Sequence, residues 1–87
     1  EKHPDADKLL KMTVDTGIDV RTIVSGIAEH YAPEEIIGKQ VSVLINLAPR
    51  KIRGIVSQGM ILMAEDNEGN LAFVSPEKTL DNGGEIR

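Results

Sequence analysis

The chain has 87 residues, enough for one small domain with a single hydrophobic core. Its 14 acidic residues outnumber its 10 basic ones, which argues against indiscriminate nucleic-acid binding, and its single Tyr and single Phe argue against a platform of several stacked bases. The absence of cysteine excludes disulfides and thiolate chemistry, and no apolar run reaches the roughly 20 residues of a membrane span.

The first predicted elements form an antiparallel hairpin. Apolar and polar residues alternate from Leu9 to Asp15, which is typical of a half-buried strand. Its inward face consists of Leu10, Met12 and Val14. A turn at residues 15–17 separates it from a second predicted strand, Arg21 to Ile27. Ser25-Gly26 inside that strand indicates a bulge or a close approach of another backbone.

A short helix is predicted next, from Pro33 to Gly38. Proline is favoured in the first helical turn, the two glutamates after it suit the positive end of the helix, and Gly38 ends it. We expect Ile36 and Ile37 to cover one end of the core.

The second half of the chain predicts three further strands. Gln40 to Ile45 alternates with Val41, Val43 and Ile45 on one face, and Met60 to Ala64 is nearly all apolar, which is typical of a strand covered on both faces. A turn at residues 66–69 then returns the chain as Leu71 to Val74, and Asn82-Gly83-Gly84 forms a last turn.

About five short strands, one brief helix and glycine-rich turns indicate a mainly β fold, a small five-stranded barrel of the oligonucleotide/oligosaccharide-binding (OB) type. That barrel places its helix between the third and fourth strands, so the order fits if the first strand is missing from this chain. The chain also begins at Glu1 without an initiator Met. We therefore expect residues 1–87 to be a single domain and a fragment of a longer polypeptide.

A basic segment, Asn46 to Met60, joins two of these strands as a long loop. Arg50, Lys51 and Arg53 lie within it, and with Lys39 they are the only charged residues between positions 36 and 64. The other six basic residues and all fourteen acidic ones lie outside that range. A local cationic surface on an acidic body favours an oriented contact with phosphates. The alternative is a solvated loop whose charges only maintain solubility.

Other chemistry is poorly supported. His3, Asp5 and Asp7 lie close together, but three ligands on one loop with His30 as the sole other histidine are a weak metal signature, and a surface turn is the better interpretation. His30 is expected to be a partly buried structural residue. No serine comes with a recognisable histidine and acid, so no catalytic residue is predicted.

Several blocks together resemble the tRNA-binding domain family, which includes the C-terminal domain of bacterial methionyl-tRNA synthetase. The most specific block runs from Asn46 to Met60 and contains Pro49-Arg50-Lys51 and Ser57-x-Gly59-Met60. The other blocks are His3-Pro4-x-Ala6-Asp7-x-Leu9, Val14-Asp15-x-Gly17, Arg21-x-Ile23-Val24-Ser25-Gly26-Ile27 and Pro33-Glu34-x-Ile36-x-Gly38-Lys39. The matches extend from His3 to about Ala64, while the first strand of the family is absent.

The resemblance implies a non-catalytic, cytoplasmic OB-fold domain that binds tRNA through its backbone and shape and that needs no cofactor, metal or membrane. It also implies a homodimer and a parent chain that is a methionine–tRNA ligase, whose catalytic domain lies elsewhere. Three alternatives stay open: a peptide-binding secretion chaperone similar to CsaA, a free-standing tRNA-binding protein, and a purely structural dimerisation domain.

The expected tRNA-binding residues have different roles. Arg50, Lys51, Arg53 and Lys39 would neutralise phosphates. Asn46 and Ser57 would hydrogen-bond sugar or phosphate, or else only brace the loop backbone. Ser25, with Gly26, would let the RNA backbone approach closely, and Met60 would pack on a base or ribose, or else belong to the core.

Overall fold

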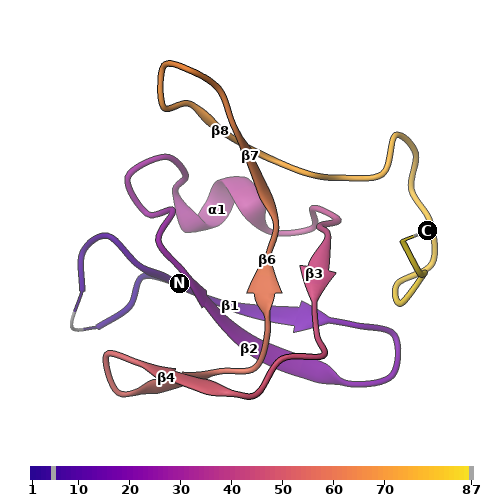
Figure 1. Cartoon of the computed structure of the whole chain (residues 1–87), viewed down its shortest axis with the longest axis horizontal. Coiled ribbons are helices and arrows are strands. Elements are labelled where there is room, and N and C mark those ends of the chain that lie inside the picture. The colour runs from indigo at the N-terminus through magenta and orange to yellow at the C-terminus, as the bar shows by residue number, and fades with distance from the viewer. Residues whose placement is uncertain (5, 87) are drawn as a thin grey trace.

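The computed structural model describes residues 1–4 and 6–86, and within them the fold is mainly β with one helical turn (Figure 1). This confirms the predicted fold class. The elements in chain order are β1 Leu10–Asp15, β2 Val20–Ser25, α1 Pro33–Ile36, β3 Val43–Leu44, β4 Arg50–Ile52, β5 Ile55–Ser57, β6 Met60–Ile61, β7 Met63–Glu65 and β8 Leu71–Phe73.

The β1–β2 hairpin carries most of the core and confirms the first prediction. The two strands pair antiparallel, from Leu10 opposite Ser25 to Asp15 opposite Val20. Leu10 and Ile23 are fully buried, and Met12 is nearly so, because alternate side chains of the hairpin point to the interior. Ile27 and Ile61 complete the buried cluster.

Gly26 does not have the role that its place in the sequence indicated. It follows the end of β2 instead of interrupting the strand, and a Cβ atom added to it would make only an ordinary contact, 3.8 Å from Leu9. Within the described part of the chain, neither a bulge nor a close approach of another protein backbone occurs at this position, and the approach of RNA to Ser25 and Gly26 stays a prediction.

Helix α1 begins at Pro33 as predicted but is a single turn that ends at Ile36, shorter than the expected range to Gly38. Pro33 opens it, and the Glu35 side chain accepts a hydrogen bond from the backbone N–H of Ala32 at 2.9 Å, which satisfies a donor that the helix leaves free. Ile36 packs against the core, but Ile37 is 82% exposed, so the expectation that both isoleucines cover the core is wrong for Ile37. One turn is too short to bury two consecutive side chains. No helix in the described ranges is long and apolar enough to cross a membrane.

The apolar run from Met60 to Ala64 forms two short strands instead of one buried strand. β6 pairs with β3, and after Leu62 the chain pairs with β8 as β7. Ile61 is buried, whereas Met60 is 51% and Leu62 is 37% exposed. The expectation that both faces of this strand are covered is wrong. The chain changes its pairing partner from β3 to β8 within three residues, so no single buried strand forms. The strand predicted over Gln40 to Ile45 is likewise shorter, Val43–Leu44.

Two-stranded ladders make up the described sheet structure: β1–β2, β3–β6, β4–β5 and β7–β8. β2 packs against β5 and β6 and so holds three of these ladders together. A groove of about 1480 Å³ lies between β1 and the segment of residues 41–46. The closure of five strands into one barrel stays a prediction.

The C-terminal segment after β8 is held by side chains and by glycine packing instead of by a strand. The Gln40 side chain accepts from the backbone N–H of Leu80 at 3.0 Å, and Ser75 donates to the Gln40 carbonyl at 2.7 Å. The turn at Asn82-Gly83 lies directly on the Thr16-Gly17 turn, so closely that neither glycine has room for a Cβ atom. In Figure 1 this segment runs outside the hairpins, along one side of the molecule.

Candidate nucleic-acid interface

The basic segment forms a hairpin, and the prediction of a long loop is wrong. Arg50 pairs with Ser57, Lys51 with Val56 and Ile52 with Ile55. The turn consists of Arg53 and Gly54, with φ values of 49° and 87°. Positive φ at both central residues is the type I′ geometry, whose twist suits a tight hairpin. Arginine is an unusual first residue for this turn, which is why the sequence did not reveal it.

The three cations of the hairpin point in different directions. Arg50 and Lys51 are consecutive in β4, so their side chains leave opposite faces of the strand, and Arg53 stands at the tip. All three are exposed, and none forms an ion pair within the described ranges. Their charges therefore remain available to an external anion. The three side chains surround the hairpin and do not form one row.

Arg21 holds the two ends of the segment that contains the hairpin. Its Nη1 donates to the carbonyl of Ile45 at 3.0 Å and to that of Gln58 at 3.0 Å. Its Nε lies 3.2 Å from Oδ2 of Asp19. The Thr16 hydroxyl, which donates to Asp19, and the Arg21 guanidinium hold the pKa of Asp19 below its ordinary value of 3.8. In the sequence Arg21 belongs to one of the resemblance blocks but has no expected role, and the signal that could have revealed one is that it carries the single charge of β2.

Two residues at the end of β5 fasten the hairpin to β2. The backbone N–H of Gln58 donates to the carbonyl of Thr22 at 2.8 Å, and its side-chain oxygen accepts from the N–H of Thr22 at 3.0 Å. The Ser57 hydroxyl accepts from the N–H of Val24 at 3.0 Å and donates to the carbonyl of Gly59 at 3.1 Å. Ser57 is only 3% exposed. Of its two expected roles, the structure supports the bracing role.

His3 supports the hairpin from the N-terminal side, where a surface turn was expected. Its side chain is buried, and Nε2 lies 3.3 Å from the carbonyl oxygen of Ile52. Asp5 lies outside the described residues, and no group of metal-ligating side chains occurs among those described. His30, by contrast, is exposed, so the prediction that it is partly buried is wrong.

The other residues predicted to contact tRNA differ in how exposed they are and in how near the hairpin they lie. Met60 is half exposed beside Leu44, its partner in the β3–β6 ladder, and Asn46 is exposed between β3 and β4. Ser25 is partly buried at the end of β2. Met60 and Asn46 therefore lie on the chain next to the hairpin and accessible to a ligand.

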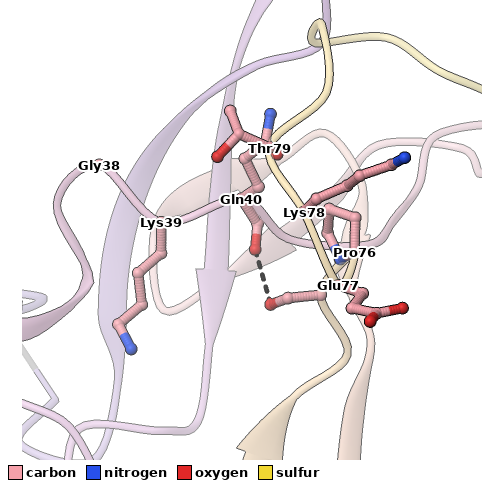
Figure 2. Close-up of a pocket in the computed structure, with 8 residues that line it drawn as sticks. Gly38, Lys39, Gln40, Pro76, Glu77, Lys78 and Thr79 are labelled. Carbon is pink, nitrogen blue, oxygen red and sulfur yellow. Dashed lines mark hydrogen bonds between the residues drawn. The ribbon is translucent and has the colours of Figure 1, made fainter.

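Lys39 lies apart from this group. It precedes β3, whereas the hairpin follows β3, so the two are at opposite ends of that strand (Figure 1). Lys39 and Lys78 line a small cavity of about 380 Å³, and Figure 2 shows the two side chains directed to opposite sides. They do not converge on one anion.

Comparison with known proteins identifies close relatives. A family model described as a putative tRNA binding domain matches residues 1–85. The chain is 65% identical over 86 residues to a methionine–tRNA ligase of Flavobacterium johnsoniae and 58% identical over 87 residues to one of Bacteroides fragilis. These matches cover 99% and 100% of this chain but only 12% and 13% of the two ligases. The chain thus spans about an eighth of the length of these relatives.

Two solved structures share the fold. The MetRS-related protein from Pyrococcus horikoshii superposes with a TM-score of 0.92 at 38% identity, covering 100% of this chain and 80% of that one. The chaperone CsaA from Bacillus anthracis superposes with a TM-score of 0.86 at 24% identity, covering 99% of this chain and 83% of that one. The likeness to the chaperone is one of fold alone.

Proposed function

The chain belongs to the tRNA-binding domain family, and we propose that the β4–β5 hairpin is the part of it that holds tRNA. The family is one of binding domains, and the chemistry of its relatives lies in other parts of much longer proteins. The observation that carries the proposal is the hairpin itself: three exposed cations without internal ion pairs within the described ranges, on a short ladder anchored by Arg21, Ser57 and Gln58.

The electrostatics suit a phosphate ligand. Each phosphate neutralised by a cation releases counterions, so binding weakens as salt rises. The acidic body of the protein repels RNA elsewhere, and the hairpin therefore sets the orientation of the complex. Asn46 and Met60 lie beside the hairpin and are proposed to contact ribose or base.

We extend the proposal to the longer protein. The chain would be the appended tRNA-binding domain of a cytoplasmic methionine–tRNA ligase, without a cofactor of its own. It would raise the tRNA concentration near a catalytic domain elsewhere on that chain. The high identity to ligases over the whole of this chain supports this assignment.

Dimerisation through the same domain is a separate part of the proposal. Ile37, Val74, Leu80 and Ile86 are 82%, 42%, 53% and 72% exposed and line the groove of about 1480 Å³. A group of exposed apolar side chains is typical of an interaction surface. Sedimentation equilibrium over a wide concentration range tests it, and a single monomeric species at all concentrations rejects it.

Filter binding of tRNA across a salt series tests the role of the hairpin. The triple variant Arg50→Gln, Lys51→Gln, Arg53→Gln should lose about 2 to 3 units of the log–log salt slope, since each phosphate contact contributes about 0.7 to 0.9. Between 50 and 200 mM salt the affinity of the unmodified chain should therefore fall about 20- to 40-fold more than that of the variant.

The matched control removes three exposed cations outside the hairpin, Lys2→Gln, Lys8→Gln and Lys78→Gln, so the net charge changes equally. It should keep the original slope. Equal slopes for the triple variant and the unmodified chain would reject the hairpin as the RNA contact.

A further inference from the structure

Residues 46–57 lie between two strands, β3 and β6, that pair with each other. Just before this segment, Leu44 pairs with Met60 in the β3–β6 ladder. Within it, β4 and β5 pair only with each other. The direction of the hairpin is therefore set by contacts with other elements: β5 packs on β2, His3 lies against Ile52, and Arg21 lies at the base.

Arg21 closes this base from β2. One nitrogen, Nη1, donates to the carbonyl of Ile45 before the segment and to the carbonyl of Gln58 after it, each at 3.0 Å. These residues are 24 and 37 positions away from Arg21 in sequence. A guanidinium suits this task because its donors are fixed in one plane, so several acceptors are bound at once without loss of geometry.

The guanidinium is itself held in place. Its Nε faces both carboxylate oxygens of Asp19, at 3.3 and 3.2 Å. Asp19 in turn accepts a hydrogen bond from the Thr16 hydroxyl, and the N–H of Asp19 donates to that hydroxyl at 3.2 Å. The turn between β1 and β2 therefore orients Asp19, Asp19 orients Arg21, and Arg21 orients the hairpin. The Arg21 side chain is only 23% exposed.

We propose that Arg21 is a positioning residue for RNA binding, which fixes the base of the β4–β5 hairpin and does not itself neutralise a phosphate. The inference rests on the proposed function of the hairpin and names a residue through which that function is controlled. A fixed base lets the cations of the hairpin bind phosphates without first losing conformational freedom, which is the benefit of preorganisation.

Affinity and salt dependence separate this role from direct contact. A residue that binds phosphate contributes about 0.7 to 0.9 to the salt slope. A positioning residue changes the affinity at every salt concentration and leaves the slope unchanged, because the number of phosphates neutralised in the complex stays the same. For Arg21 we expect an affinity loss of about tenfold, since hydrogen bonds from a charged donor are among the stronger ones.

The decisive variant is Arg21→Lys, which keeps the charge but cannot hold Asp19 and two carbonyls with one planar group. We expect weaker tRNA binding with an unchanged salt slope. Lys8→Arg serves as the control, because it also keeps the charge, and Lys8 is exposed and has no bond to the hairpin or its base within the described ranges. It should leave affinity nearly unchanged.

Asp19→Asn gives a second, milder test in which the two explanations predict opposite signs. Removing a negative charge should strengthen tRNA binding if only long-range electrostatics act. If Asp19 orients Arg21, binding should weaken, because an amide cannot accept from the guanidinium as both carboxylate oxygens do.

Hydrogen exchange of the free protein tests the clamp without RNA. In Arg21→Lys the amides of residues 46–57 should exchange faster, while the buried positions of β1 and β2 stay protected. Unchanged exchange in residues 46–57, unchanged affinity in Arg21→Lys, or a slope reduced by about one unit in Arg21→Gln would each overturn the proposal. If the unmodified chain binds no tRNA, the proposed function fails, whereas the exchange result still decides whether Arg21 fixes the hairpin.

Discussion

Replacing Ser57 by alanine tests whether this serine braces the protein or contacts RNA. Its hydroxyl lies in a buried position, accepts from the N–H of Val24 in β2 and donates to the carbonyl of Gly59. Ser57→Ala removes the acceptor and leaves the Val24 N–H without a partner in a site that water does not reach. We therefore expect loss of stability, with RNA binding affected only through the fold.

The size of the effect follows from this geometry. Leaving a buried backbone donor unsatisfied costs about 1 to 3 kcal/mol, while the atom removed is too small to create a substantial cavity. A domain of this length has a free energy of unfolding of about 4 to 13 kcal/mol, so the loss is a large fraction of the total. For a domain of about this size each kcal/mol lowers the melting temperature by roughly 4 to 8 °C.

Urea unfolding followed by circular dichroism measures the stability, and tRNA binding is measured at a temperature where both variants are folded. Ser25→Ala is the matched control, since Ser25 was also predicted to contact RNA and its hydroxyl has no partner in the described part of the chain. It should change stability by less than about 0.5 kcal/mol. If Ser57→Ala is as stable as the original chain but binds tRNA with a changed salt slope, the hydroxyl faces the RNA and the bracing role is refuted.

Three further outcomes are expected. Gly17→Ala should destabilise more than Gly69→Ala, because both glycines have positive φ but only at Gly17 would a Cβ atom meet another backbone; equal melting temperatures would contradict the packing of the last turn. Arg53→Asn should raise stability by about 0.5 to 1 kcal/mol, since asparagine adopts positive φ more readily, while tRNA affinity falls; loss of both would show that the turn is not of this type. Hydrogen bonds, first from the Asn70 side chain, lower the pKa of Asp66 below 3.8, so the ionised carboxylate stabilises the folded state above pH 3.8 and this contribution is lost as pH falls through the lowered pKa. Asp66→Ala should therefore reduce the urea midpoint at pH 6, and the reduction should become smaller as pH falls below 3.8; an equal reduction at every pH would exclude this linkage.

Prediction from the sequence succeeded where the local structure depends on a residue and its near neighbours in the chain. The alternation of Leu10, Met12 and Val14 depends only on the two-residue period of a strand, and the structure confirms it. The same holds for Pro33 at the start of the helix and for Gly69 with φ of 82° in the turn before β8.

Prediction failed where a segment has a choice of partners. The apolar run from Met60 to Ala64 predicts one strand. In the structure its first part pairs with β3 and its second part with β8, so two short strands form. Ile37 is as apolar as Ile36, yet only Ile36 has the core beneath it. The apolar character of a side chain means that its burial is favourable. It does not determine whether another part of the chain packs over that side chain.

The sequence by itself determined that a small, mainly β chain carries its positive charge in one segment, and the blocks around that segment identified the family. Only the tertiary structure decided that the segment is a hairpin and that Arg21, Ser57 and His3 hold it. These contacts join residues between 24 and 49 positions apart, such as Arg21 with Ile45 and His3 with Ile52. Local patterns fix the direction of a side chain relative to its own strand, but the acceptor that it meets is set by how distant strands pack.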